Sequence, residues 1–171
     1  TKGDILILNT FATSGNPITL GSSLIYLTDQ PNACNSTQIN QNTPMSLNVV
    51  YFVKNTSLWR RTVAPTGYDT AGCSTPWQQP SCAVGQTASF CKTEDIKLLD
   101  NITVNDFNVE YFTSADSSTA NADASNVAKT VPERNTALQS STTVGVSLNV
   151  TKSVAGREVS RQDRQLHHLL L

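Results

Sequence analysis

Residues 47–61 constrain the fold more strongly than any other stretch of this chain. Four apolar residues recur there at every second position, which is the period of a β-strand: Leu47, Val49, Tyr51 and Val53. A tight turn is predicted at 54–57, and a return strand begins at 58–61. Phe52 faces away from the other four, so we expect the first strand of this hairpin to be covered on both sides.

Further strands are predicted on both sides of this hairpin. The clearest alternation runs over 144–151, where Val or Leu alternates with Gly, Ser, Asn or Thr. The pattern also predicts a buried strand over 4–8, a half-buried strand over 107–111, and short strands at 18–20, 24–27 and 158–160. No long amphipathic helix is expected. The fold class is therefore mostly β to α+β, an antiparallel sheet with long loops.

The segments between these strands are unusually long. Residues 28–46 read as a polar loop, and 64–91 as an insertion that carries three of the four cysteines. Residues 94–99 fit either a turn of helix or a strand. Residues 113–143 are rich in Ser, Ala, Asn and Thr, which predicts a flexible excursion inside a hairpin. We expect one globular domain over 1–160, followed by a tail at 161–171.

Four cysteines are the candidates for disulfide bonds: Cys34, Cys73, Cys82 and Cys91. No Cys-x-x-Cys pair occurs, and both histidines are near the C-terminus, so a zinc site is not expected. Two disulfides that hold long loops are favoured over four buried thiols, and they would imply an oxidising compartment. Three pairings are possible. The preferred one joins two of the last three cysteines and adds a long-range bond to Cys34.

Composition argues against several classes of function. The net charge is −1 and only 15% of the residues are charged, so the chain has no global attraction to nucleic acid or anionic membrane. Solubility rests on neutral polar groups, namely 15 Asn, 18 Ser and 22 Thr. No run approaches the ~18 apolar residues of a membrane span. The chain opens without Met at Thr1, and we expect a further segment to precede it.

The sequence offers only weak candidates for metal-binding or catalytic residues. Glu94, Asp95, Asp100 and Asp106 could supply oxygen ligands to calcium, but solvated or turn-capping acids are the favoured reading. His167 and His168 could chelate a metal only poorly, because neighbouring residues on a strand point to opposite faces. No catalytic motif occurs, so neither an enzyme nor a cofactor is expected.

Five segments, in this order, carry a resemblance to a known family: 3–8, 51–61, 98–102, 107–111 and 146–157. The third reads Leu-Leu-Asp-Asn-Ile, and the last reads Val-x-Leu-x-Val-x-Lys followed by Ala-Gly-Arg. Together they resemble the globular domains of minor type IV pilins and of J-class minor pseudopilins of type II secretion. The insertion at 64–91 is not part of that family pattern.

This resemblance implies a structural role without catalysis. A family member has a long apolar N-terminal helix, missing from these 171 residues, which packs on the sheet and anchors the subunit in the membrane before assembly. Its partners are other minor and major pilins of a bacterial surface filament, and it primes assembly or sits at the tip. Some members act in adhesion, DNA uptake or protein transport.

A secreted β-sandwich adhesin or carbohydrate-binding module is the alternative. It predicts an exposed aromatic platform, for which the candidates are Tyr26, Trp59, Tyr68 and Trp77. Arg60 and Arg61 beside these tryptophans could also form a basic and aromatic patch. The favoured reading of this pair is two surface arginines on one strand, facing opposite ways.

Overall fold

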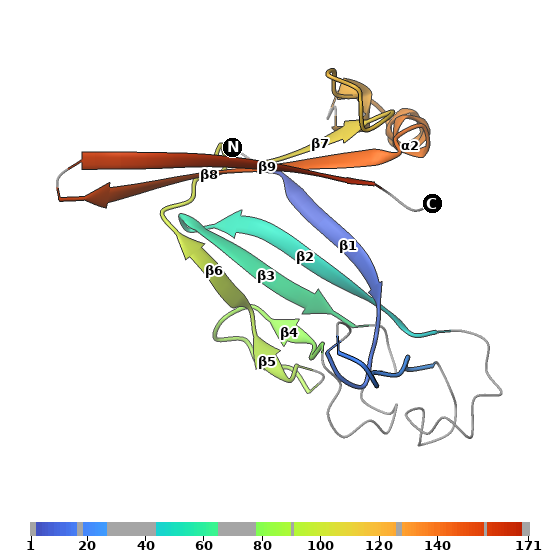
Figure 1. Ribbon diagram of the computed structural model, residues 1–171. Helices are drawn as coiled ribbons and strands as arrows, with labels where there is room; N and C mark the ends of the chain where they lie inside the picture. The colour runs from blue at the N-terminus through green and yellow to red at the C-terminus, as the bar shows by residue number, and fades with distance from the viewer. Residues whose placement is uncertain are drawn as a thin grey trace. The chain divides into compact units, whose positions relative to one another are not determined.

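A computed structural model describes residues 3–16, 19–26, 44–64, 78–89, 91–125, 128–155 and 157–168 (Figure 1). Within these ranges the protein is mostly β, with three sheets and two short helices. Its internal contacts divide the chain into two compact units. One comprises Thr1–Ile5, Phe52–Leu58 and Leu99–Leu171, and the other comprises Leu6–Tyr51 and Trp59–Leu98. None of the described helices is long and apolar enough to span a membrane.

The largest sheet has four strands in the order β1-β2-β3-β6. Its strands are β1 (Ile5–Phe11), β2 (Ser46–Lys54), β3 (Ser57–Val63) and β6 (Ile96–Asp100). The hairpin predicted over 47–61 is confirmed as β2 and β3. Asn55 and Thr56 both have left-handed backbones, with φ of 50° and 56°, as a two-residue hairpin turn requires. The ambiguity at 94–99 is resolved in favour of a strand.

One side of this sheet holds a buried core. Ala12, Ile25, Met45 and Leu47 form one cluster, and each is at most 2% exposed. Backbone hydrogen bonds tie three of these segments together: the Ala12 N–H donates to the Met45 carbonyl and the Met45 N–H to the Ile25 carbonyl. The core therefore combines β2 with two segments that are not regular strands.

Two strand predictions near this core were wrong in part. Thr19 and Leu20 lie in a turn, where the Thr19 N–H and hydroxyl both donate to the Asn16 carbonyl. Leu24 and Tyr26 form only isolated bridges. Local hydrogen bonding after Asn16 and the positive φ of Gly21 override the β propensity of this stretch. Ile18, Leu27 and most of the loop 28–46 lie outside the described residues.

The expectation of a buried strand over 4–8 was also wrong in one respect. The strand exists as β1, but Ile5 is 55% exposed and Ile7 is 61% exposed. The physical reason is that Ile5 and Ile7, two residues apart, lie on the same face of β1, and this face is exposed to solvent.

A short parallel pair flanks the sheet. β4 (Ser81–Cys82) pairs with β5 (Thr93–Glu94), and a disulfide joins Cys82 to Cys91 with a Cα–Cα distance of 5.7 Å. The expectation of a disulfide bond is thereby confirmed. Cys34 and Cys73 lie outside the described residues, as does most of the insertion 64–91.

The third sheet has the order β7-β8-β9 and is antiparallel. It is built from β7 (Phe107–Phe112), β8 (Thr143–Val154) and β9 (Arg157–His168). The strands expected at 107–111 and 144–151 are confirmed. The last strand is longer than 158–160, and residues 161–168 of the expected tail belong to it. Its twelve-residue pairing with β8 supplies a backbone ladder that outweighs the weak strand propensity of Gln, Asp and Arg.

Both faces of β8 are buried near its start. Thr143, Gly145 and Ser147 are buried on one face, and Val144 is 4% exposed on the other, where Val146 and Leu148 are partly buried. On the first face, Phe112 of the neighbouring β7 is opposite Thr143 and is 1% exposed. A large aromatic side chain on that face is accommodated by small neighbours.

The segment 113–143 does connect two antiparallel strands, but it is not devoid of regular structure. It contains α1 (Ala122–Ser125) and α2 (Val131–Gln139), which contact each other, and α1 also contacts β7 (Figure 1). The signal for α2 lies at its start, where Thr130 precedes Pro132 and Glu133. The Thr130 N–H and hydroxyl both donate to the Glu133 carboxylate, at 2.8 and 2.7 Å.

Candidate functional site

The four-stranded sheet has two faces, which we define by their residues. The outer face carries the apolar residues Ile7, Phe11, Val50, Trp59, Val63, Ile96 and Leu98, together with the polar Asn9, Asn48 and Arg61. The inner face carries Leu8, Thr10, Leu47, Val49, Tyr51, Arg60 and Thr62. Alternation along each strand assigns these two sets to opposite sides of the sheet.

Hydrogen bonds fix which residues share the outer side. The Asn9 amide donates to the Asn48 amide oxygen at 3.1 Å, so these two residues lie on one face of β1 and β2. Phe11 and Val50, each two residues along, lie on that same face. The Ser57 hydroxyl donates to Asp100 at 2.9 Å, which likewise places Trp59 and Leu98 together on β3 and β6.

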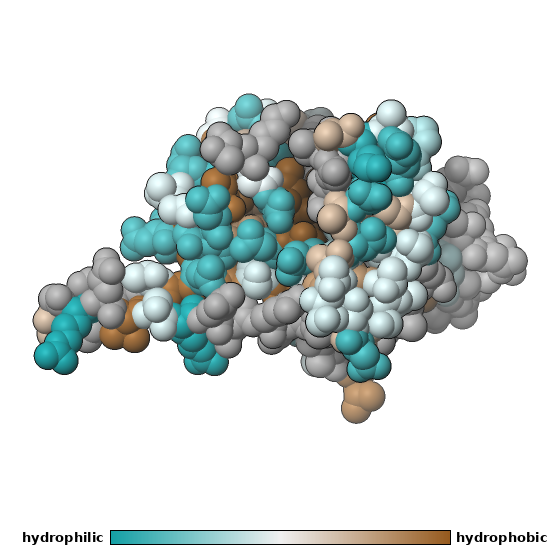
Figure 2. Space-filling model, turned by 90° about the horizontal axis from the view of Figure 1, so that it is seen from above, coloured by the Kyte–Doolittle hydropathy of each residue, from teal (hydrophilic) through white to brown (hydrophobic). Residues whose placement is uncertain are grey.

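The outer face is apolar and exposed to solvent. Ile7 is 61% exposed and Phe11 54%, and Val63, Ile96 and Leu98 are each more than 40% exposed. The view from above in Figure 2, which labels no residues, shows apolar side chains at the surface between polar ones on that side of the molecule. A run of exposed large apolar residues on one sheet face marks a surface that binds another element.

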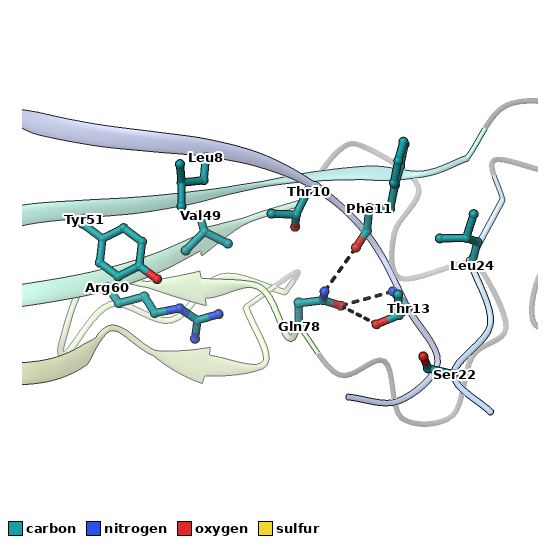
Figure 3. Close-up of a pocket in the computed structure, with 10 residues that line it drawn as sticks. All are labelled: Leu8, Thr10, Phe11, Thr13, Ser22, Leu24, Val49, Tyr51, Arg60 and Gln78. Atoms are coloured by element: carbon teal, nitrogen blue, oxygen red, sulfur yellow. Dashed lines mark hydrogen bonds between the residues drawn. The ribbon is translucent and has the colours of Figure 1, made fainter. Parts of the chain in front are cut away.

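The inner face carries a cavity of about 520 Å³. Figure 3 shows its lining residues, with the Phe11 ring pointing away from Gln78 and thus toward the other side of the sheet. Gln78 is 6% exposed and spans one wall. Its amide nitrogen donates to the Phe11 carbonyl at 3.1 Å, and its amide oxygen accepts from the Thr13 N–H at 3.2 Å.

Arg60 and Arg61 point to opposite sides of β3, as predicted. Arg60 lines the inner cavity, whereas Arg61 forms a bidentate ion pair with Asp95. The distances are 2.9 Å from Nε to Oδ1 and 2.7 Å from Nη2 to Oδ2. Hydrogen bonding to Asp95 raises the pKa of the Arg61 guanidinium.

The four candidate calcium ligands serve separate structural roles. Glu94 accepts from the Gly85 N–H, and Asp95 pairs with Arg61. Asp100 accepts from the Ser57 hydroxyl, and Asp106 accepts from the N–H and hydroxyl of Thr103. Across the described ranges, no group of three or more His, Cys, Asp or Glu residues is placed to hold a metal ion.

The remaining candidates are dispersed. His167 and His168 lie at the end of β9, opposite Val144 and Thr143. Trp59 and Tyr26 are both partly buried. Tyr68 and Trp77 lie outside the described residues, so the aromatic platform of the alternative reading stays a prediction.

Comparison of the chain with protein-family models, with curated proteins and with solved structures gives no match. Sequence reasoning missed the exposed outer face and the role of Gln78. The uninterrupted apolar run over 5–8 was a usable signal for the first, because it supplies apolar residues to both faces of β1.

Proposed function

We propose that this chain is the globular domain of a minor type IV pilin or of a J-class-like minor pseudopilin. In this role it is a structural subunit, without catalysis, of a bacterial surface filament or pseudopilus. Two kinds of observation support the proposal. The first is the order of the five sequence segments named above, and the second is the character of the four-stranded sheet.

The exposed outer face is the observation that carries the proposal. In the family that the sequence resembles, an apolar N-terminal helix packs on an antiparallel sheet. The outer face offers such a helix apolar contacts on all four strands, from Ile7 on β1 to Leu98 on β6. A helix of ~20 residues is about 30 Å long and buries an apolar stripe against the sheet on which it packs.

Partners and location follow from this role. Other minor and major pilins would contact the domain through its loops and sheet edges, and the helix would hold it in the membrane before assembly. The Cys82–Cys91 disulfide favours an oxidising environment outside the cytoplasm. Priming of assembly and placement at the filament tip, with a part in adhesion, DNA uptake or protein transport, are the associated functions.

The experiment is mass-spectrometric sequencing of the N-terminus of the native protein from its source cells. The proposal predicts a methylated aromatic N-terminal residue followed by a long apolar segment that ends near Thr1. A terminus left by an ordinary signal peptidase close to Thr1 would contradict it. The secreted adhesin or carbohydrate-binding module would then be the reading to test, by screening glycans.

A further inference from the structure

The inner cavity contains a cation that has no partner among the described residues. Arg60 is partly buried and lines the cavity, and it forms no ion pair or hydrogen bond with any residue that the structure describes. Its neighbour Arg61 shows the contrast, because a two-pronged bond to Asp95 satisfies that guanidinium. A partly buried guanidinium has five N–H donors and no acceptor, so it favours an anionic partner in a fixed geometry.

Two hydroxyl groups in the lining of the same cavity also have no partner among the described residues. The two-residue turn of the hairpin places Tyr51 directly opposite Arg60 on the neighbouring strand. The Thr10 hydroxyl is buried and makes no hydrogen bond. Figure 3 shows Thr10 with its oxygen directed toward the side of the sheet where Gln78 and Arg60 lie. Buried polar groups without partners are rare enough to call for a ligand or water.

The rest of the cavity lining is largely apolar. Gln78 is locked by bonds to the backbone of Phe11 and Thr13, so it forms a fixed wall. Leu8, Leu24 and Val49 supply apolar lining. The volume of about 520 Å³ lies within the range of ~300–1,000 Å³ that is usual for small-molecule sites.

We propose that this cavity, which we call the Arg60 pocket, binds an organic carboxylate that carries an apolar group. The carboxylate would accept two hydrogen bonds from the Arg60 guanidinium and one from Tyr51. The apolar group would contact Leu8, Leu24 and Val49. Arg60 is the one cation in the described lining of the cavity. A ligand with a single negative charge therefore matches the cavity better than a doubly charged phosphate does. This inference is independent of the pilin proposal.

The test is titration of the folded protein with N-acetylphenylalanine, followed by calorimetry and by backbone NMR shifts. N-acetylphenylalanine amide is the matched control, because it keeps the ring and loses the charge. The acid should bind with a Kd in the millimolar range or below, and the amide about tenfold or more weakly, as loss of a charged hydrogen-bonded pair requires. The shifts should centre on Thr10, Tyr51 and Gln78. Equal binding of acid and amide would overturn the proposal, as would no binding of either.

Variants distinguish binding in the Arg60 pocket from a general attraction of the acid to positive charge on the protein. Arg60→Gln should weaken binding of the acid about tenfold or more, whereas Arg60→Lys should retain part of it. Arg157→Gln removes the same charge from an exposed position on β9 and should leave binding unchanged. An equal loss in Arg157→Gln would contradict the proposal. Tyr51→Phe provides a second variant with little change in packing, and it should weaken the acid more than the amide.

A short peptide identifies the natural source of the carboxylate. Gly-Gly-Phe with a free C-terminus has the same terminal group as N-acetylphenylalanine but a longer chain. Tighter binding of the peptide would assign the pocket to the C-terminal end of a polypeptide. Binding of the small acid alone would assign it to a free carboxylic acid.

Discussion

The inner and outer faces of the four-stranded sheet both carry large apolar residues but differ in how far these residues are buried. On the inner face Leu47 is 1% exposed, because it packs in one cluster with Ala12, Ile25 and Met45, and Val49 is 5% exposed. On the outer face Ile7 and Phe11 are more than half exposed. The difference shows that alternation along a strand identifies an apolar face. Alternation does not show which segment or which protein packs on that face.

The largest expected effect comes from truncating one residue on each face. Leu47→Ala should lower the free energy of unfolding by about 2–5 kcal/mol, because it leaves a cavity in the buried cluster. Leu98→Ala on the outer face should lower it by less than about 1 kcal/mol, because the side chain is already 41% exposed. Urea unfolding of both variants measures the difference. Equal losses would mean that the two faces are equally covered.

The Cys82–Cys91 disulfide closes a loop next to the inner face of the sheet, so its removal is expected to lower the stability on that side. The Thr62 N–H on β3 donates to the Ser81 hydroxyl oxygen, and Cys82 follows directly. The double variant Cys82→Ser, Cys91→Ser should lose about 2–3 kcal/mol, as expected for a loop closed over this separation. The melting temperature of this variant and of the parent chain would be compared without reductant. An unchanged value would show that the bond does not restrain this segment.

The two arginines of β3 give a smaller effect with a matched control. Asp95→Asn breaks the two-pronged bond to Arg61, and the Asp95 side chain is only 5% exposed, so about 1–2 kcal/mol should be lost. Arg60→Gln on the inner face should change stability by less than about 0.5 kcal/mol, because no described residue pairs with it. Equal effects in urea unfolding would contradict the assignment of partners.

The smallest expected effect lies outside both faces, at the start of α2. Hydrogen bonds from the Thr130 hydroxyl and N–H lower the pKa of Glu133. A lowered folded-state pKa contributes stability above the ordinary glutamate pKa, and this contribution is lost as pH falls through the folded value. Thr130→Ala should raise the pKa of Glu133 toward the ordinary value, as measured by NMR titration. Far-UV circular dichroism of the same variant shows whether α2 is retained.

Much of the fold could be predicted from the sequence, because alternation is a local property. The hairpin over 47–61 and the strands over 107–111 and 144–151 follow from period-two patterns and turn residues. The helix α2 was missed because its residues lack an apolar stripe, and its signal is only the Thr130–Glu133 cap. The end of β9 was missed because its pairing comes from the ladder with β8 and not from its own propensity.

The candidate site was less predictable than the fold. Alternation could assign Arg60 and Arg61 to opposite sides, but it could not show that only Arg61 has a carboxylate partner. Gln78 comes from a stretch without periodicity, and its role depends on contacts with Phe11 and Thr13, more than sixty residues away. Exposure of the outer face likewise depends on what packs against it, which no local pattern encodes.

The most direct test of the pilin proposal is the accessibility of the outer face in the protein as its source cells make it. Leu98→Cys would be introduced into that native protein and into the 171-residue chain, and both would be labelled with a thiol reagent, with labelling located by mass spectrometry. Val84→Cys in an exposed turn serves as the reference. If the proposed N-terminal helix covers the outer face, labelling at position 98 should be at least about tenfold slower in the native protein, while labelling at position 84 should be unchanged. Equal rates at position 98 in both proteins would contradict the proposal.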